Sequence, residues 1–190
     1  MRKLVTDHLL SLDGFCCGPD DEIDWFTFDE ESLEFSRQLL RGASMVILGR
    51  RTFELFAKYW PTPEARHEEP VISERLTTLP KLVFSRSLVT STWENTRLVR
   101  DPVAGVIREL KQGSGGHLLL CGSPTILATL WKEHLVDELN VRIQPIVLGG
   151  GRPLLPQTAE RYPLVHRDGR VFRSGVTGLR YEVAALSTSA

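Results

Sequence analysis

The chain has 190 residues, which is enough for one domain with a full hydrophobic core and too few for two domains of ordinary size. Hydrophobic residues make up 42% and charged residues 25% of the chain, values typical of a soluble globular protein. Because 23 basic and 24 acidic residues leave a net charge of −1, there is no overall electrostatic attraction to nucleic acid or to an anionic membrane. We therefore expect one domain over 1–186 and a tail at 187–190, with neither nucleic acid nor membrane as a partner.

The sequence shows no sign of export, of a membrane span or of a metal site. No run approaches the roughly 20 apolar residues that cross a bilayer, and Asp7 and His8 interrupt the apolar residues after the basic N-terminus. Cys16, Cys17 and Cys121 form no Cys-x-x-Cys motif and lie at no zinc-ligand spacing from a histidine. We expect a cytoplasmic protein with free thiols and no metal.

The first half of the chain alternates between apolar runs and helix signals. The elements expected there, in chain order, are a strand at 3–10, a helix at 29–41, a strand at 45–48 and a short helix that ends near residue 59. Asp29 can accept hydrogen bonds from the free N–H groups at the start of the first helix, and Gly42 is typical of a helix end. An acidic segment at 16–28 and a polar loop at 61–80 are expected to be irregular, and the pattern at 72–76 allows one helical turn within the loop.

The second half of the chain shows the same alternation and ends in a hairpin pattern. The expected elements, in chain order, are strands at 81–84 and 91–94, a helix at 102–111, a strand at 117–121, a helix at 124–133, a strand at 138–143 and paired strands at 171–174 and 179–184. Strands that alternate with helices favour parallel pairing with helices on both faces, whereas a hairpin is antiparallel. We therefore expect an α/β fold around a mixed, mostly parallel sheet.

Three of these strands end in small, polar or basic residues. The residues are Gly49, Arg50, Arg51 and Thr52 after the second strand, Ser85, Arg86 and Ser87 after the strand at 81–84, and Gly122 and Ser123 after the strand at 117–121. Because ligands bind where the carboxyl ends of neighbouring parallel strands meet, we expect one shared shelf if these strands are neighbours. Glycine N–H groups and a helix N-terminus suit a pyrophosphate. Arginine forks suit a terminal phosphate such as the 2′-phosphate of NADP, which NAD lacks.

Each motif has a plainer interpretation when it is taken alone. The two arginines after Gly49 are also typical of a solvent-exposed helix start, and the segment 85–87 is also typical of an ordinary turn. Gly122 lies directly between a strand and a helix and favours a ligand most. No Gly-x-Gly-x-x-Gly follows the first strand, and neither a Walker A motif nor Gly-x-Ser-x-Gly occurs. A standard dinucleotide fold, a P-loop NTPase and a serine hydrolase are therefore disfavoured.

Six short segments are distributed along most of the chain in one fixed order, at residues 11–15, 48–54, 81–86, 120–126, 135–139 and 145–154. Together they resemble the dihydrofolate reductase-like superfamily, and most closely its riboflavin-biosynthesis reductase branch (the RibD C-terminal domain) and the stand-alone members of that branch. The resemblance implies a three-layer α/β/α sandwich with a C-terminal antiparallel hairpin, NADPH bound across the three strand ends, and a homodimer. The residues to which it assigns cofactor contacts are Gly49, Arg50, Arg51, Thr52, Ser85, Arg86, Gly122, Ser123, Thr125 and Ile126.

The chain departs from this branch in two respects. It lacks the His-x-Glu and Pro-Cys-x-x-Cys motifs of a zinc deaminase, so the resemblance implies no deamination. The riboflavin reductase domain usually follows its second strand with a Thr-Val…Asp-x-Pro pattern, whereas the segment 51–54 is more similar to dihydrofolate reductases. The substrate therefore does not follow from the resemblance.

Hydride transfer from a nicotinamide also requires a proton for the adjacent heteroatom, from a carboxylic acid or from water. Carboxylates gather between the first loop and the first helix, at Asp13, Asp24, Asp29, Glu30 and Glu34. Asp13 and Asp29 are the catalytic candidates, although Asp13 is also typical of a turn and Asp29 of a helix cap. Trp25 and Phe26 are candidates for the wall of a substrate pocket, with core packing as the alternative.

The leading hypothesis is an NADPH-dependent reductase of a small nitrogen heterocycle or a ribosylaminopyrimidine, such as 5-amino-6-(5-phosphoribosylamino)uracil. The glycines at 149–151 then either border the nicotinamide or form a simple turn. One alternative is a non-catalytic protein that binds a nucleotide or an antifolate on the same scaffold, and another is a dihydrofolate reductase. A purely structural subunit is the third, and it leaves the arginines at the strand ends unexplained.

Overall fold

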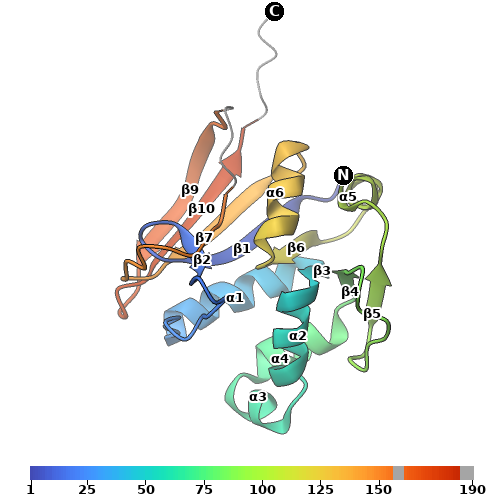
Figure 1. Ribbon diagram of the computed structural model, residues 1–190, viewed down its shortest axis with the longest axis horizontal. Helices are drawn as coiled ribbons and strands as arrows, with labels where there is room; N and C mark the ends of the chain where they lie inside the picture. Colours follow the sequence, from blue (N-terminus) through green and yellow to red (C-terminus); the bar gives the residue numbers. More distant parts are fainter. Residues whose placement is uncertain (156–160, 185–190) are drawn as a thin grey trace, which may run out of the picture.

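The computed structural model describes residues 1–155 and 161–184, and most of its elements build or cover one long sheet (Figure 1). The strands are β1 (Leu4–Leu10), β2 (Phe15–Cys17), β3 (Ala43–Gly49), β4 (Lys81–Phe84), β5 (Thr96–Val99), β6 (His117–Cys121), β7 (Glu138–Ile143), β8 (Arg152–Pro153), β9 (Leu164–Val171) and β10 (Thr177–Val183). The helices are α1 (Glu30–Gly42), α2 (Arg50–Tyr59), α3 (Pro63–Glu68), α4 (Pro70–Thr78), α5 (Val103–Gln112) and α6 (Pro124–Lys132). Within these described ranges, no helix combines the length and apolar character that a membrane crossing requires. The expected tail at 187–190 lies outside the described residues.

The eight strands of the main sheet lie in the order β5-β4-β3-β6-β1-β7-β10-β9. Neighbours from β5 to β7 pair in parallel, whereas β10 pairs antiparallel with both β7 and β9. The short strands β2 and β8 form a separate antiparallel pair. The expectation of a mixed, mostly parallel sheet with an antiparallel hairpin near the C-terminus is confirmed.

Helices cover both faces of the sheet because alternate residues of each strand point to opposite sides (Figure 1). On one face, Leu118 and Leu120 of β6 belong to the same buried cluster as Leu127 of α6, together with residues of α5. On the other face, Leu119 belongs to a cluster with Phe35 of α1 and with residues of α2 and α4. The expected three-layer α/β/α sandwich is confirmed.

The prediction of an irregular loop at 61–80 is wrong, because this segment contains α3 and α4. Only the helical turn allowed at 72–76 agrees, since it lies within α4. Proline breaks a helix from inside but is favoured at its first position, which is where Pro63 and Pro70 lie. Ile72 and Leu76 are buried, yet helices of 6 and 9 residues are too short to show a clear apolar period.

Two predicted strands are displaced. The strand expected at 91–94 begins later, as β5, and Trp93 instead packs on Phe53 with ring centroids 6.0 Å apart. The first hairpin strand, expected at 171–174, lies earlier as β9, whose residues are all exposed. A strand exposed on both faces has no alternating apolar pattern to reveal it.

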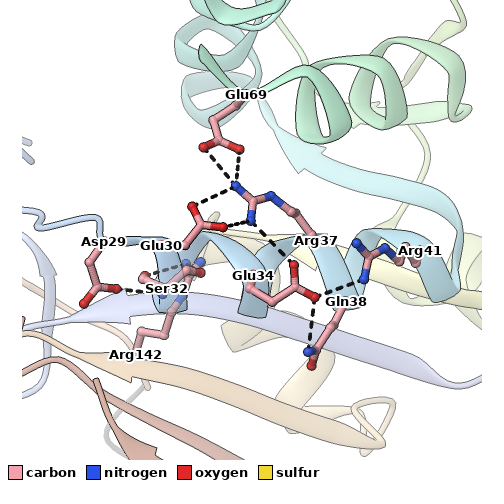
Figure 2. Close-up of polar contacts among 9 residues, drawn as sticks. All are labelled: Asp29, Glu30, Ser32, Glu34, Arg37, Gln38, Arg41, Glu69 and Arg142. Atoms are coloured by element: carbon pink, nitrogen blue, oxygen red, sulfur yellow. Dashed lines mark hydrogen bonds and ion pairs between the residues drawn. The ribbon is translucent and has the colours of Figure 1, made fainter. Parts of the chain in front are cut away.

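Polar contacts fix helix α1 to its neighbours (Figure 2). At its N-terminus, Oδ1 of Asp29 accepts the N–H of Ser32 at 2.8 Å, so the expected helix cap is confirmed. Arg142 of β7 donates to the carbonyl of Ser32 at 3.0 Å and ties the first turn to the sheet. Arg37 lies 2.9 Å from the carboxylate of Glu69 at the start of α4. The helix is therefore held both to the sheet and to the next helix of its layer.

His8 of β1 is buried in the sheet, with 1% of its surface exposed. Burial, with a further contribution from the guanidinium of Arg142, lowers the pKa of His8 from 6.5 to about 3. The unfolded chain therefore takes up a proton at this residue near pH 6.5, whereas the folded protein does so only near pH 3. The stability that depends on neutral His8 is fully present above pH 6.5 and is lost as the pH falls toward 3.

We expect His8→Leu to weaken the acid dependence of stability. Between about pH 6.5 and 4.5, the free energy of unfolding should fall by about 2 kcal/mol more in the wild type than in the variant, since one pH unit contributes at most about 1.4 kcal/mol. Urea unfolding at a series of pH values measures this difference. His67→Gln changes an exposed histidine of α3 and should keep the wild-type pH dependence. An equal effect of both substitutions would contradict the role of His8.

Candidate functional site

The three predicted strand ends meet at one edge of the sheet. β4, β3 and β6 are consecutive neighbours that pair in parallel, so they end side by side. Gly49 of β3 is opposite Phe84 of β4, and β6 is followed directly by Gly122. β1 lies next to β6 and leads into the loop at 11–14. The three strands are therefore neighbours, which meets the condition for one shared shelf.

The turns that follow β3 and β6 are joined through the hydroxyl group of Ser123. Its oxygen accepts the N–H of Gly49 at 2.7 Å and lies 3.0 Å from Oγ1 of Thr52. A Cβ atom on Gly49 would come within 3.0 Å of this oxygen. A Cβ atom on Gly122, whose φ is +53°, would come within 3.1 Å of the Thr52 side chain. Glycine at both positions therefore allows the two helix starts to lie close together.

The two helices that start here lack the negative charge that is usual at a helix N-terminus. Helix α1 begins with Asp29, Glu30 and Glu31, but the first turns of α2 and α6 hold no acidic residue. Neither Gly49 nor Ser123 caps its helix with a side-chain hydrogen bond. The N–H groups of both first turns therefore concentrate positive potential at the end of the strands, which favours an anion.

The predicted phosphate ligands Arg50 and Arg86 are both exposed at this edge. Arg50 forms an ion pair with Glu54, one helical turn away, at 3.0 Å. An exposed pair of this kind is weak, so the guanidinium can exchange its partner. Ser85 is buried, and its hydroxyl accepts the N–H of Leu88 at 2.9 Å, which shapes the turn after β4.

Three more of the predicted cofactor residues lie on the first turns of α2 and α6. Arg51 contacts the carboxylate of Asp21. Thr125 is exposed at the start of α6. Ile126 is buried, and its Cδ1 lies 3.4 Å from the point that a Cβ atom on Gly49 would occupy. The structure thus brings the whole predicted set to one edge, and its contacts with a cofactor stay a prediction.

Asp13 joins the loop after β1 to the glycine loop. Its carboxylate accepts the N–H of Leu148 at 3.2 Å and that of Gly149 at 2.8 Å. A hydrogen bond with the Ser11 side chain and these two N–H groups hold the pKa of Asp13 below its usual range. Asp13 is therefore an ionised turn residue in this structure, and its catalytic role stays a prediction.

Asp29 also reaches the hairpin at the C-terminal end. While its Oδ1 caps α1, its Oδ2 accepts the N–H of Ser174 at 3.0 Å. Burial raises the pKa of Asp29, but hydrogen bonds from Ser174 and Ser32 outweigh it and leave the pKa below its usual range. Both carboxylate oxygens are thus engaged in structural contacts, and a catalytic role for Asp29 stays a prediction.

Trp25 and Phe26 lie half-buried just before α1. Their rings meet edge to face with centroids 4.5 Å apart, and Phe28, which is 54% exposed, lies edge-on to Phe26. The N–H of Thr27 donates to Oε1 of Gln144 at 2.9 Å, which places this aromatic segment beside the end of β7. Aromatic surface therefore lies near the edge that carries the glycine turns, and its contact with a substrate stays a prediction.

Sequence reasoning missed two charged clusters near this edge. Arg152 on β8 lies 2.6 Å from the carboxylate of Asp21, and Arg142 lies 2.8 Å from the carboxylate of Asp7 beneath α1. The available signals were an arginine directly after three glycines and charges within two apolar strands. The partners are 131 and 135 positions apart, so no local pattern reveals the pairing.

Proteins similar to this chain cover almost its whole length. A sequence model described as the RibD C-terminal domain matches residues 2–168. The protein YyaP of Bacillus subtilis (strain 168), described as uncharacterized, is 30% identical over 181 residues, which make up 95% of this chain and 94% of the relative. The protein YwjB of the same organism, also described as uncharacterized, is 26% identical over 176 residues, or 92% of this chain and 95% of the relative.

Solved structures share the fold. A putative riboflavin biosynthesis protein from Shewanella sp. PV-4 has a TM-score of 0.73 and 19% identity, with 96% of this chain and 99% of that chain covered. A diaminohydroxyphosphoribosylaminopyrimidine deaminase/5-amino-6-(5-phosphoribosylamino)uracil reductase from Thermotoga maritima has a TM-score of 0.68 and 14% identity, with 96% of this chain and 57% of that chain covered. At these identities the likeness establishes a dihydrofolate reductase-like α/β fold.

We expect Gly122→Ala to destabilise the protein by about 1–2 kcal/mol, because alanine would adopt a left-handed backbone and crowd Thr52. Adding Thr52→Ser removes the crowding methyl group and should recover part of the loss. Urea unfolding measures both effects. Gly105→Ala is the control, since an added Cβ there meets nothing within 4 Å in α5 and should stabilise the helix by about 0.5–1 kcal/mol. A Gly122 variant as stable as this control would contradict the tight turn.

Proposed function

The chain belongs to the family of RibD C-terminal domains, and we propose that it is an NADPH-dependent reductase of a small nitrogen heterocycle or a ribosylaminopyrimidine. Family membership supports a reductase of the riboflavin-pathway type. The name of the Thermotoga maritima protein includes 5-amino-6-(5-phosphoribosylamino)uracil reductase, which supports a related substrate for this chain. A cytoplasmic location is part of the proposal and is supported by three free cysteines.

The observation that carries the proposal is the convergence of two helix N-termini and several arginines at one edge. The N–H groups of Gly49 and Gly122 already donate to Oγ of Ser123 and to the carbonyl of Asp7, so phosphate oxygens would approach the N–H groups of the first helical turns that follow. The first turns of α2 and α6 would bind the pyrophosphate of NADPH. Arg50 and Arg86 would bind the 2′-phosphate, because the guanidinium fork matches a phosphate.

The remaining residues would serve the reduction itself. Bound NADPH would supply the hydride. Trp25 and Phe26 would provide an apolar aromatic wall for a heterocycle and limit the access of water. Because the pKa values of Asp13 and Asp29 lie below the usual range, both groups are ionised at neutral pH and would accept hydrogen bonds from the N–H groups of a substrate. Water is then the immediate proton donor that the chemistry favours.

The engagement of both carboxylates in structural contacts favours one alternative as well. A protein that binds a nucleotide or an antifolate without turnover needs the phosphate-binding first turns of α2 and α6 but no proton donor. A dihydrofolate reductase is the alternative with a different substrate, and it agrees with the segment at 51–54. Turnover and substrate preference separate these functions.

We also propose a homodimer, with β9 in the interface. This strand lies at the edge of the sheet and pairs with β10 on one side. Its residues are all exposed, including Val165 at 42% and Val171 at 69%. A long exposed edge strand with apolar side chains is a surface that pairing with a second copy would protect.

We expect NADPH to bind more tightly than NADH. Arg50→Ala and Arg86→Ala should each weaken NADPH binding by about 1–3 kcal/mol, as for a charge-assisted hydrogen bond, and leave NADH binding nearly unchanged. Isothermal titration calorimetry measures both ligands. Arg108→Ala is a matched control, because Arg108 also forms an exposed ion pair, with Glu133, and lies on α5. A failure to bind NADPH at millimolar concentration, or equal affinity for NADH, would contradict the proposed cofactor.

We expect steady-state oxidation of NADPH in the presence of a ribosylaminopyrimidine and much slower oxidation with dihydrofolate. Absorbance of the reduced nicotinamide measures both rates. Faster turnover of dihydrofolate would identify a dihydrofolate reductase instead. Tight binding of NADPH without turnover across a panel of heterocycles would favour the non-catalytic binding protein.

A further inference from the structure

One carboxylate bridges two arginines beside the start of α2. Oδ2 of Asp21 contacts Nη1 of Arg51, and Oδ1 of Asp21 lies 2.6 Å from Nη2 of Arg152. Arg51 lies on the first turn of α2, whereas Arg152 lies on β8, directly after the glycines at 149–151. Two guanidinium groups from distant parts of the chain therefore converge on a single carboxylate.

The position of this carboxylate is one where negative charge is needed. Cations near a helix N-terminus oppose the helix dipole, and the first turn of α2 carries Arg50 and Arg51 but no acidic residue. Asp21 supplies the missing negative charge from a separate loop, as Glu30 and Glu31 do within α1. Any anion of similar shape placed here would relieve the same repulsion.

The loop that carries Asp21 is a tight turn with a strained residue at its tip. Asp21 has a φ of 63°, a left-handed conformation that costs a residue with a side chain roughly 1 kcal/mol. Its N–H donates to the carbonyl of Gly18 at 3.1 Å, and the N–H of Gly18 donates to the carbonyl of Glu22 at 3.0 Å. The turn thus presents the carboxylate to the arginines, and the two ion pairs help to keep it in this conformation.

The two ion pairs are open to exchange. The side chains of Arg51, Asp21 and Arg152 are 57%, 42% and 37% exposed, so water reaches all three. Exposed ion pairs contribute little to stability and are screened by salt. A phosphate matches the spacing of a carboxylate toward two guanidinium forks and carries more charge, so it is the stronger partner for the pair.

We propose that Arg51 and Arg152 form a phosphate-binding pair and that Asp21 is an internal competitor for it. A ligand phosphate displaces the Asp21 carboxylate, and the turn at 18–22 moves away from α2. The proposal rests on the proposed function and extends it, because it adds Arg152 to the residues that would bind a phosphate at this edge and makes their affinity for phosphate depend on Asp21. The phosphate belongs either to the cofactor or to a phosphorylated substrate.

Substitution of Asp21 tests the competition directly. Asp21→Asn keeps the size of the side chain and removes its charge, and it should tighten the binding of inorganic pyrophosphate about three- to tenfold, since two exposed ion pairs no longer compete. Asp21→Gly should do the same and also relieves the left-handed backbone, so the test survives if the asparagine variant folds poorly. Asp20→Asn is the matched control, because Asp20 is exposed on the same turn and forms no ion pair within the described residues. Unchanged or weaker pyrophosphate binding in both Asp21 variants would overturn the proposal.

Substitution of Arg152 tests the pair and identifies the source of the phosphate. Arg152→Ala should weaken pyrophosphate binding about tenfold and should reduce the gain from Asp21→Asn when the two are combined. An equal loss for NADPH and NADH would assign the pair to the cofactor pyrophosphate, whereas a loss for ribose 5-phosphate alone would assign it to the substrate. If Arg152→Ala changes none of these affinities, Arg51 and Arg152 do not form a phosphate-binding pair, even if NADPH binds to the protein. If pyrophosphate binding depends on Arg152 but NADPH does not bind, the proposed function fails and the pair stands.

Discussion

The rest of the structure depends on the parallel pairing of β4, β3, β6 and β1. Parallel strands cannot be joined by a tight turn, so the chain must leave each strand at the same edge and return along a face of the sheet. After β3 and β6 it returns as α2 and α6, which places two helix N-termini side by side at the carboxyl edge. The hydrogen bond from Gly49 to Ser123 then fixes the distance between them. Positive potential at this edge is therefore a consequence of topology, and the arginines add to a field that the backbone already supplies.

The same edge is built at a local cost to stability. Ser123 and Asp21 have left-handed backbones, and Arg50 and Arg51 oppose the dipole of the helix that carries them. In a protein selected only for stability, an acidic residue would cap the start of α2, as Asp29 caps α1 in this protein. Strained and unbalanced residues that gather at one edge are typical of a ligand site, because the ligand supplies the compensating interactions.

The sequence predicted the bounds of the buried central strands better than those of the strands at the edges of the sheet. The bounds of β4 and β6 agree with apolar runs, and those of β7 agree with a partly alternating segment. These strands are largely buried, and glycine or a polar residue follows each of them. β9 was misplaced because an edge strand with exposed faces needs no apolar alternation.

The candidate site at the carboxyl edge of the sheet was predictable from the strand ends. Arg152 was not, since its partner Asp21 is brought near only through the β2–β8 pair. Local patterns likewise identified Asp13 and Asp29 as turn and cap residues. Their lowered pKa values depend in part on the N–H groups of Gly149 and Ser174, which only the tertiary fold brings near.

A buried ion pair connects the carboxyl edge of the sheet to helix α1, which Asp29 caps. The carbonyl of Asp7 accepts the N–H of Gly122, so the backbone of β1 holds the turn before α6. The side chain of Asp7 pairs with Arg142. Arg142 in turn holds the first turn of α1 through Ser32 (Figure 2). A buried pair of this kind contributes little net stability, because its desolvation offsets most of its attraction, but it permits only one arrangement of the elements that it joins. The turn at Gly122 and the start of α1 are therefore fixed relative to each other through Asp7 and Arg142, whether or not a ligand is bound.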